Sequence, residues 1–304
     1  MKTSKKKILI TGATGYVASQ ILPYMFDNYE TVLLDTRSCD RKGQKLEGIN
    51  VVDLIDSDRS KYSHFFENVD GVIHLAYKRR SGIALDHYYD EKDNVSMAYN
   101  VLRCSYDYDV KRVVMASSNH AADWYEHALI HEGRMENLEP SLLPLSDNFY
   151  GWAKATYEHL GFLFACGGMG EGVDGAAQGN LIKGNLGTSR KMGVVMVRIG
   201  APRELEFDRY RDDPKSFIRD LGAYISRRDI TQLFCKAIET SDINNQYGVP
   251  WQVVYGISDN ARSFWSLTTA REILGYHPKD DSEFKFRTLI KQILHNEVRR
   301  IPDG

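Results

Sequence analysis

The stretch Ile8-Leu9-Ile10-Thr11-Gly12-Ala13-Thr14-Gly15-Tyr16-Val17-Ala18 decides the fold, because a short apolar run enters a glycine-spaced turn just before an amphipathic segment. Gly12 permits a tight turn, Gly15 lets the backbone approach a pyrophosphate, and the small Ala18 allows the next helix to pack close to the strand. The free N–H groups at the start of that helix would face the anion. The stretch therefore predicts the pyrophosphate site of a dinucleotide, formed by Gly12, Ala13, Thr14, Gly15, Tyr16 and Val17.

An acidic residue follows at the distance that this kind of site requires. The apolar run Val32-Leu33-Leu34 ends in Asp35, about 20 residues beyond Gly15, where a carboxylate can accept hydrogen bonds from the adenosine ribose hydroxyls. The same carboxylate would repel a 2′-phosphate, so NAD is favoured over NADP. Arg37 lies close enough to accommodate such a phosphate, and the use of NADP therefore stays open.

Composition and charge narrow the possible partners. The 304 residues are 42% hydrophobic, enough for one sizeable core and a smaller lobe. The net charge of −2 gives no electrostatic footprint for nucleic acid or an anionic membrane, and no segment approaches the roughly 20 apolar residues of a membrane span. The four cysteines lie far apart, which favours reduced thiols in a cytoplasmic protein. His127 and His131 lack a third ligand, so we expect no metal site and a small soluble substrate.

Strand-like and helix-like segments alternate through the first two-thirds of the chain. Strands are expected near 6–11, 30–35, 49–53, 71–76, 111–117 and 193–199, and helices near 16–28, 58–67, 84–107 and 148–165. This alternation predicts an α/β fold with a Rossmann-like, doubly wound parallel sheet that is covered on both faces.

Two changes in this rhythm indicate the domain organisation. Residues 167–192 are rich in glycine and show no period, so they predict a surface insertion. It is either a lid over the substrate or a loop without a role, and we favour the loop. After residue 200 the pattern becomes irregular, with helices expected at 229–241, 267–274 and 282–298 and a strand at 251–255. We expect residues 1–200 to form an NAD-binding Rossmann domain and residues 201–304 a smaller substrate-binding lobe.

Two segments carry the side chains that could perform chemistry. The strand at 111–117 leads into Ser118-Asn119-His120 at the carboxyl edge of the sheet, where ligands bind in open α/β folds. Tyr150 and Lys154 are four residues apart, so they share one face of a helix. A phenol is a poor base at its ordinary pKa near 10, but an ammonium stabilises its phenolate and a serine hydroxyl can orient the reacting oxygen. Tyr150 could then take a proton from a sugar hydroxyl while the carbon beneath gives hydride to a nicotinamide.

These motifs together resemble the short-chain dehydrogenase/reductase superfamily, specifically its extended branch, the NAD-dependent epimerase/dehydratase family. The counterparts are Gly12-x-x-Gly15-x-x-Ala18, Asp53-Leu54, His74-Leu75-Ala76, Asn94, Ser118 and Tyr150-x-x-x-Lys154. The resemblance implies that Ser118 orients the substrate, that Tyr150 is the base, and that Lys154 holds the nicotinamide ribose and lowers the pKa of the tyrosine. It further implies cofactor contacts by Asp53, Leu54, Leu75, Ala76, Tyr77, Asn94, Tyr150 and Lys154.

Three features most resemble the uronate dehydrogenases within that branch. They are Ser118-Asn119-His120, Arg198-Ile199-Gly200 and the run Val254-Tyr255-Gly256-Ile257-Ser258-Asp259-Asn260-Ala261-Arg262-Ser263-Phe264-Trp265. The resemblance implies oxidation of the anomeric carbon of a hexuronic acid to a lactone with NAD. In such an enzyme Ser118, Asn119 and His120 would bind the sugar.

Two positions depart from that pattern. Tyr77-Lys78-Arg79-Arg80 stands where the family has a serine after the His-Leu strand end, and Ala201 replaces the serine that follows Arg-Ile-Gly. The arginine that would grip the sugar carboxylate has no unique counterpart among Arg203, Arg209 and Arg211, of which we expect Arg209 and Arg211 to bind substrate. Lys78 and Arg79 at the cleft mouth suit a phosphate equally well, so a sugar-phosphate dehydrogenase is an alternative.

Two further functions stay open. A sugar-nucleotide epimerase or dehydratase would return the hydride to the same substrate, and a regulator would bind NAD(H) without turnover. The presence of Ser118, Tyr150 and Lys154 argues against a pure sensor, which has no need of a positioned base. The resemblance also implies a homodimer built by the helix at 84–107 and the helix that carries Tyr150. The tyrosines that crowd the first of these helices fit core and subunit packing.

Overall fold

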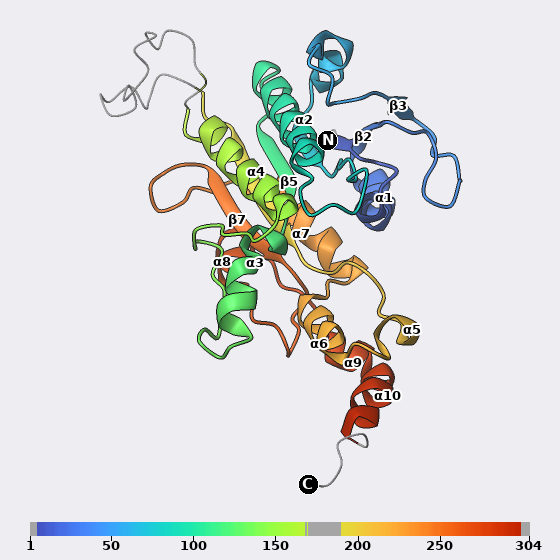
Figure 1. Cartoon of the computed structure of the whole chain (residues 1–304). Coiled ribbons are helices and arrows are strands. Elements are labelled where there is room, and N and C mark those ends of the chain that lie inside the picture. The colour runs from blue at the N-terminus through green and yellow to red at the C-terminus, as the bar shows by residue number, and fades with distance from the viewer. Residues whose placement is uncertain (1–4, 168, 170–189, 299–304) are drawn as a thin grey trace.

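The computed structural model describes residues 5–167, 169 and 190–298. Within these residues the chain forms one sheet of seven parallel strands in the order β3-β2-β1-β4-β5-β6-β7 (Figure 1). The strands are β1 (Lys7–Thr11), β2 (Glu30–Asp35), β3 (Ile49–Val51), β4 (Gly71–His74), β5 (Arg112–Ser118), β6 (Gly193–Ile199) and β7 (Trp251–Gly256). The predicted Rossmann-like, doubly wound parallel sheet is confirmed.

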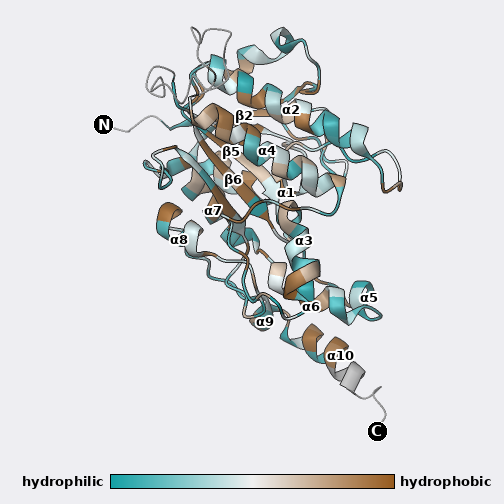
Figure 2. Cartoon of the chain, turned by 60° about the vertical axis from the view of Figure 1, so that its left-hand side comes forward, coloured by the Kyte–Doolittle hydropathy of each residue, from teal (hydrophilic) through white to brown (hydrophobic). Residues whose placement is uncertain are grey.

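Helices cover both faces of this sheet. Successive side chains of a strand point to opposite faces, and the core divides accordingly into two clusters. One face packs against α1 (Tyr16–Asn28), α7 (Arg227–Glu239) and α8 (Thr268–Leu274). The other packs against α2 (Tyr88–Asp107) and α4 (Phe149–Ala165). Figure 2 shows the apolar strands enclosed between helices that carry more hydrophilic residues.

The strand order changes direction between β1 and β4, and this switch point creates the crevice for a ligand. Thr11 at the end of β1 lies beside His74 at the end of β4, and Thr11 Oγ1 is 2.7 Å from His74 Nδ1. The loops that follow these two strands therefore touch. Gly12 adopts a φ of +68°, and a Cβ atom there would lie 2.5 Å from the Ala76 backbone nitrogen, so this position requires glycine.

Two expected helices are not single regular α-helices. Residues near 58–67 form two short 3-10 helices, η1 (Arg59–Lys61) and η2 (Ser63–Phe66). The Asp58 side chain caps η1, and the buried Phe66 anchors η2. The segment expected at 282–298 is divided at Phe286 into α9 (Ser282–Lys285) and α10 (Arg287–Val298). Hydrophobic period does not report such breaks, because single caps and single buried side chains decide them.

The structure places part of residues 201–304 in the main sheet, not in a separate lobe. β7 pairs with β6 from Val194 and Trp251 to Ile199 and Gly256, so the strand expected in the lobe extends the sheet. A second, smaller core joins α5 (Phe207–Tyr210), α6 (Pro214–Ala223), α9 and α10, below the sheet in Figure 1. We propose that this smaller cluster of helices is the substrate lobe.

One connection links the sheet to that cluster. Between β5 and α4 lie η3 (Asn119–Ala122), α3 (Asp123–Tyr125) and the π-helical turn η4 (Glu126–Ile130), and Glu126 pairs with Arg219 of α6 at 2.7 Å. The insertion expected at 167–192 lies almost entirely outside the described residues. The alternatives of a lid and a loop therefore stay predictions. Among the helices in the described part of the chain, none combines the length and the apolar character needed to cross a membrane.

Candidate active site

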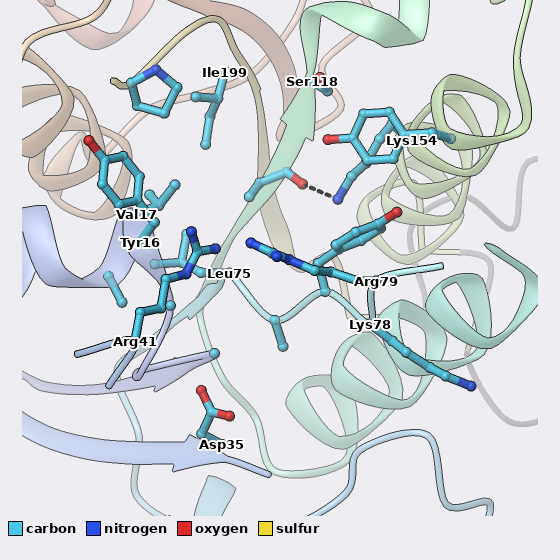
Figure 3. Close-up of a pocket in the computed structure, with 18 of the residues that line it drawn as sticks. Tyr16, Val17, Asp35, Arg41, Leu75, Lys78, Arg79, Ser118, Lys154 and Ile199 are labelled. Atoms are coloured by element: carbon cyan, nitrogen blue, oxygen red, sulfur yellow. Dashed lines mark hydrogen bonds between the residues drawn. The ribbon is translucent and has the colours of Figure 1, made fainter. Parts of the chain in front are cut away.

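A cavity of about 1460 Å³ opens at the carboxyl edge of the sheet (Figure 3). The glycine turn, the ends of β2 and β5, the loop after β4, the first turns of α4 and residues 199–209 bound it. Most of the predicted site residues line it: Gly12, Gly15, Tyr16, Val17, Asp35, Arg37, Asp53, Leu54, Leu75, Ala76, Tyr77, Lys78, Arg79, Ser118, His120, Tyr150, Lys154 and Arg209. The fold thus gathers segments that are far apart in the sequence around one space.

The first turn of α1 is open to an anion. Its N-cap residue is Gly15, which offers no side-chain bond, and no acidic residue lies in that turn. A Cβ atom on Gly15 would lie 2.9 Å from the Gly12 carbonyl oxygen, so a side chain would crowd the turn. An uncapped helix start beside bare glycine backbone suits a phosphate group, and it fits the diphosphate of the dinucleotide that the sequence predicts.

Asp35 stands at the end of β2 and is held by Thr14. The backbone N–H and the hydroxyl of Thr14 both donate to Asp35 Oδ2, at 2.9 Å and 2.7 Å. Because the turn directs Thr14 to this carboxylate, Thr14 does not line the cavity, and neither does the buried Ala13. The cofactor contacts expected of Ala13 and Thr14 stay predictions. Asp35 Oδ1 accepts from the Arg37 N–H at 3.3 Å.

The basic side chains of Arg41, Lys78 and Arg79 at the cavity point in different directions. Arg41, which the sequence analysis missed, lies 5.6 Å from the Tyr16 ring and points toward Arg79 in Figure 3. Partial burial, followed by the like charges of Arg79 and Arg37, lowers the pKa of Arg41. Lys78 is directed away from both, and its ammonium pairs with Asp93, so its role in binding substrate stays a prediction. Two facing guanidinium groups form an arrangement that an anion stabilises.

Ser118, Tyr150 and Lys154 meet at the end of β5. Asn148 caps α4 by accepting from the Gly151 N–H at 2.9 Å, and this cap fixes the first turn, which carries Tyr150. Lys154 is buried, and its Nζ donates to the Ala116 carbonyl oxygen at 2.9 Å, the dashed line in Figure 3. Ser118 is close enough to Tyr150 to affect the pKa of its hydroxyl, and the Tyr150 ring centre lies 5.8 Å from Lys154 Nζ. The three residues expected to do chemistry are therefore neighbours.

Burial controls the ionisation of this group. Burial lowers the pKa of Lys154 to about 8, against the opposing charge of Glu91. Burial also raises the pKa of Tyr150, while the neighbouring Ser118 hydroxyl lowers it. A depression by Lys154 stays a prediction.

His120 lines the cavity, whereas Asn119 does not. The His120 ring lies edge-on to Tyr150 with ring centres 5.5 Å apart, and its Nδ1 pairs with the buried Asp123. Asn119 is buried because the 3-10 turn after β5 directs it into the protein. Its Oδ1 accepts from the Ser118 hydroxyl at 3.4 Å. The expected contact of Asn119 with the sugar stays a prediction.

Two other predicted residues lie outside the cavity. Asn94 on α2 accepts from the Lys78 N–H at 2.8 Å and donates to the Lys78 carbonyl oxygen at 2.9 Å, so it fixes the loop after β4, and its cofactor contact stays a prediction. Arg211 makes an exposed pair with Asp212 at 3.1 Å and does not line the cavity. Arg203 lines it instead. Local backbone direction decides which of these arginines faces the cavity, and sequence spacing does not report that direction.

Two features of the site were not found from the sequence. Glu91 is fully buried on α2 and accepts from the Tyr77 hydroxyl at 2.6 Å. A second cavity of about 1050 Å³ shares Tyr77, Arg79 and Tyr150 with the first, and its further lining includes the apolar side chains Ile83, Leu85, Phe149 and Trp152. The signal for Glu91 is a carboxylate one helical turn before Asn94, which places both on one face of α2.

The model of the NAD dependent epimerase/dehydratase family matches residues 8–164, a span that includes the glycine turn, Ser118, Tyr150 and Lys154. The chain belongs to this family. It is 29% identical to the NAD-dependent glucose-6-phosphate dehydrogenase of Haloferax volcanii, over 92% of this chain and 95% of the relative. It is 26% identical to the uronate dehydrogenase of Pseudomonas putida, over 95% of this chain and 89% of the relative. The solved structure of a mutated uronate dehydrogenase superposes with a TM-score of 0.67 at 26% identity, covering 95% of this chain and 86% of that one.

Family membership confirms the resemblance that the motifs indicated, with uronate dehydrogenases among the relatives. NAD is the cofactor of this family. The uncapped start of α1 and the bare Gly12 and Gly15 backbone fit its diphosphate, and Asp35 at the cavity wall fits its adenosine ribose.

Proposed function

We propose that the protein is an NAD-dependent dehydrogenase that oxidises the anomeric carbon of a hexuronic acid to a lactone. The observation that carries the proposal is that Ser118, Tyr150 and Lys154 line the cavity that also holds the glycine turn, with Lys154 Nζ 5.8 Å from the Tyr150 ring centre. Relatives matched over at least 91% of this chain are named uronate dehydrogenase, glucose-6-phosphate dehydrogenase and L-arabinose 1-dehydrogenase. Dehydrogenation of a sugar is what these names share.

Different residues of the chain are proposed to bind different parts of the cofactor. Hydride acceptance is the chemistry that bound NAD supplies. We assign its diphosphate to the start of α1, its adenosine ribose to Asp35, and its nicotinamide ribose to Lys154. Arg37 and Arg41 lie on the Asp35 side of the cavity, and Arg37 is the residue that would accept a 2′-phosphate if NADP is also used.

The proton is handled by Ser118 and Tyr150. Ser118 donates a hydrogen bond to the reacting sugar oxygen, and the Tyr150 phenolate oxygen takes the proton of the anomeric hydroxyl as the carbon loses its hydride. The Lys154 ammonium, fixed to Ala116, offsets the negative charge of the phenolate. His120, steadied by Asp123, lies beside the Tyr150 ring and binds a sugar hydroxyl.

Arg209 is the proposed anchor for the substrate carboxylate. It enters the cavity from the smaller helical cluster, and its guanidinium lies 5.3 Å from the Tyr210 ring. Arg203 lines the same region but lies 3.8 Å from Asp220, which compensates part of its charge. A planar guanidinium can hold a carboxylate through two parallel hydrogen bonds.

A hexose phosphate is the second candidate substrate. Arg79 lines the cavity and faces Arg41, and the relative that acts on glucose 6-phosphate by name is 29% identical. A phosphate with two negative charges would compensate this pair more fully than a single carboxylate.

A substrate screen tests the proposal. Galacturonate, glucuronate, arabinose and glucose 6-phosphate are each incubated with NAD or NADP, and NADH or NADPH formation is followed by absorbance while products are separated by chromatography. Lactone with stoichiometric NADH from a uronate supports the proposal, and turnover of the phosphate alone transfers the anchoring role to Arg79. Isomerised sugar without net NADH would identify an epimerase. NADH binding without turnover of any sugar would identify a sensor.

We further propose that the protein works as a homodimer in the cytoplasm. Large apolar side chains are exposed on and just before α2 and on α4: Ile83, Leu85, Tyr88, Tyr89, Tyr99 and Trp152. Tyr88 packs against Tyr89 and Trp152, and clustered exposed apolar side chains are typical of a protein interface. The four cysteines, all among the described residues, are free thiols, which is consistent with a reducing compartment.

A further inference from the structure

The ammonium of Lys154 lies in an enclosed, aromatic environment. Its Nζ is 4.3 Å from the centre of the Tyr157 ring and 5.3 Å from that of Tyr77. Its hydrogen-bond partner is the Ala116 carbonyl, a neutral group, and the described residues give it no direct ion pair. Keeping a buried ammonium charged in this setting is costly, and the aromatic faces compensate for part of that cost.

Glu91 supplies a negative charge on the far side of Tyr77. Its Oε1 accepts from the Tyr77 hydroxyl at 2.6 Å and its Oε2 accepts from Asn94 Nδ2 at 3.2 Å. His87 Nε2 lies 3.8 Å from Oε1. Both oxygens of this fully buried group act as acceptors, which is the bonding pattern of an ionised carboxylate.

We propose that Tyr77 and Glu91 are positioning residues that together keep the Lys154 ammonium charged and in place. Tyr77 is the link, because its ring lies near Lys154 and edge-on to Tyr150, with ring centres 5.4 Å apart, while its hydroxyl donates to Glu91. A phenol that donates to a carboxylate has a more electron-rich ring, and such a ring attracts a cation more strongly. The inference rests on the proposed function, since it takes Lys154 to hold the cofactor.

The sign of the effect follows from the groups around Lys154. Titratable groups face it from several elements: His74 at the end of β4, Tyr77 on the following loop, Glu91 on α2, and Tyr150 and Tyr157 on α4. Glu91 is the carboxylate among them, and it raises the pKa of Lys154 while burial lowers it to about 8. The ammonium exists below this pKa, so removing the Glu91 charge moves its loss to lower pH.

Cofactor affinity is a cleaner readout of this effect than turnover. Glu91 also raises the pKa of Tyr150, so Glu91→Gln changes turnover through two groups in opposite directions. NAD affinity depends on the charge of Lys154 without requiring a tyrosine base. It also requires no sugar, so the measurement is independent of which substrate the enzyme uses.

The experiment measures the dissociation constant of NAD by titration calorimetry on the full chain, from about pH 6 to about pH 10. Wild-type affinity is expected to fall as the pH rises through about 8. In Glu91→Gln the midpoint moves to lower pH, and affinity at neutral to mildly alkaline pH falls about threefold or more. Tyr77→Phe moves the midpoint in the same direction by less. Glu91→Asp, which keeps the charge, retains a midpoint near that of the wild type.

Two control variants separate the possible failures. Lys154→Met is expected to abolish the pH transition. If it does while Glu91→Gln and Tyr77→Phe keep the wild-type midpoint, the inference is overturned and the role of Lys154 stands. If Lys154→Met retains the transition, the role of Lys154 in the proposed function fails instead. Glu239→Gln removes the charge from a matched pair remote from the cavity, in which the Tyr29 hydroxyl donates to Glu239 at 2.6 Å, and it must leave the midpoint unchanged. Thermal melting by circular dichroism checks that each variant is folded. If Glu91→Gln is unfolded, the inference is tested with Tyr77→Phe.

Discussion

At the scale of single residues, the site's ionisable side chains are governed by how deeply they are buried. Burial is the largest influence on the pKa of Lys154, Tyr150 and His74, and single hydrogen bonds then act on top of it. The nearby Ser118 hydroxyl lowers the pKa of Tyr150, whereas the Ala116 carbonyl accepts a hydrogen bond from the ammonium of Lys154. Reactivity here depends on which neighbour each polar atom meets in a nearly dry environment.

Tyr150→Phe tests the base. Turnover of the uronate is expected to fall by roughly 10²- to 10⁴-fold, because the variant has no oxygen to accept the proton, while NAD affinity stays close to that of the wild type. Stopped-flow measurement of NADH formation and calorimetric NAD binding give the two numbers. Tyr247→Phe, at an exposed position, is the matched control and keeps full turnover. Equal turnover in both variants would remove Tyr150 from the mechanism.

His74 predicts a dependence of stability on pH. Burial, assisted by the charge of Lys154, lowers the pKa of His74 from 6.5 to about 3. Because the unfolded chain binds this proton first, stability is lost as the pH falls below the unfolded value, by roughly 2 kcal/mol between pH 7 and pH 5. Urea unfolding at both pH values measures the loss, which His74→Gln is expected to reduce. His159→Gln, at an exposed position on α4, keeps the wild-type dependence. A loss of equal size in His74→Gln would contradict the assignment.

The sequence named the reactive residues correctly as neighbours but not all of the supporting ones. Ser118, Tyr150 and Lys154 were identified because motif spacing along a strand end and a helix carries that information. Asn94, Asn119 and Arg211 are expected to contact ligands, and the structure shows the protein groups that they bind. Their direction depends on how the flanking elements are rotated in the fold, and that rotation is set by tertiary packing.

At the scale of elements, a buried ion pair fixes α4 on the sheet. Glu158 lies one turn after Lys154 and accepts from Arg198 of β6 at 2.8 Å and 2.7 Å. The Ser117 hydroxyl of β5 donates to the same carboxylate at 2.8 Å, and the Tyr255 hydroxyl of β7 accepts from Arg198 at 3.0 Å. Three strands are thereby bonded to the helix that carries Tyr150 and Lys154. The network fixes the position of α4 relative to the end of β5.

Glu158→Gln tests the importance of this network for stability. Removing one charge leaves Arg198 buried without compensation, so the free energy of unfolding is expected to fall by roughly 3–5 kcal/mol. Asp259→Asn breaks the exposed pair of Asp259 with Arg271, whose atoms are 2.7 Å apart, and is expected to change it by no more than about 1 kcal/mol. Urea titrations of both variants provide the comparison. Similar losses in the two variants would show that burial of the network does not matter.

Most elements could be predicted from periodicity, and the misplacements have physical causes. The expected strands and the long helices correspond closely to β1–β6, α1, α2 and α4. Residues 58–67 were expected to be helical but form 3-10 turns, since a side-chain cap and one buried phenylalanine shape them. The strand at 251–255 was found, but its place beside β6 depends on a pairing between distant segments that no local pattern encodes.

At the scale of the whole molecule, the sheet presents two cavities that share one wall. The cofactor cavity and the more apolar second cavity both include Tyr77, Arg79 and Tyr150. The second opens toward the exposed apolar side chains before α2, where Ile83 and Leu85 are 93% and 91% exposed. An interface on this side would lie close to Tyr150, the proposed base, so assembly and activity are expected to be linked.

Leu85→Asp combined with Tyr89→Asp tests the proposed homodimer. Both side chains are exposed, and charges placed there would oppose burial in an interface. Light scattering on a sizing column is expected to report a dimer for the wild type and a monomer for the double variant. Phe284→Asp, on the equally exposed α9, is the control and keeps the wild-type mass. A wild-type monomer at micromolar concentration would reject the proposal.

The uncapped start of α1 has a practical consequence for work with the purified protein. The backbone N–H groups that suit a diphosphate can also donate hydrogen bonds to sulfate or inorganic phosphate. Any ion bound there in the native state raises the apparent melting temperature by mass action. The phosphate ion of a phosphate buffer therefore competes with NAD and stabilises the protein when no NAD is bound. Chloride solutions with zwitterionic buffers are the reference in which variants of this enzyme can be compared.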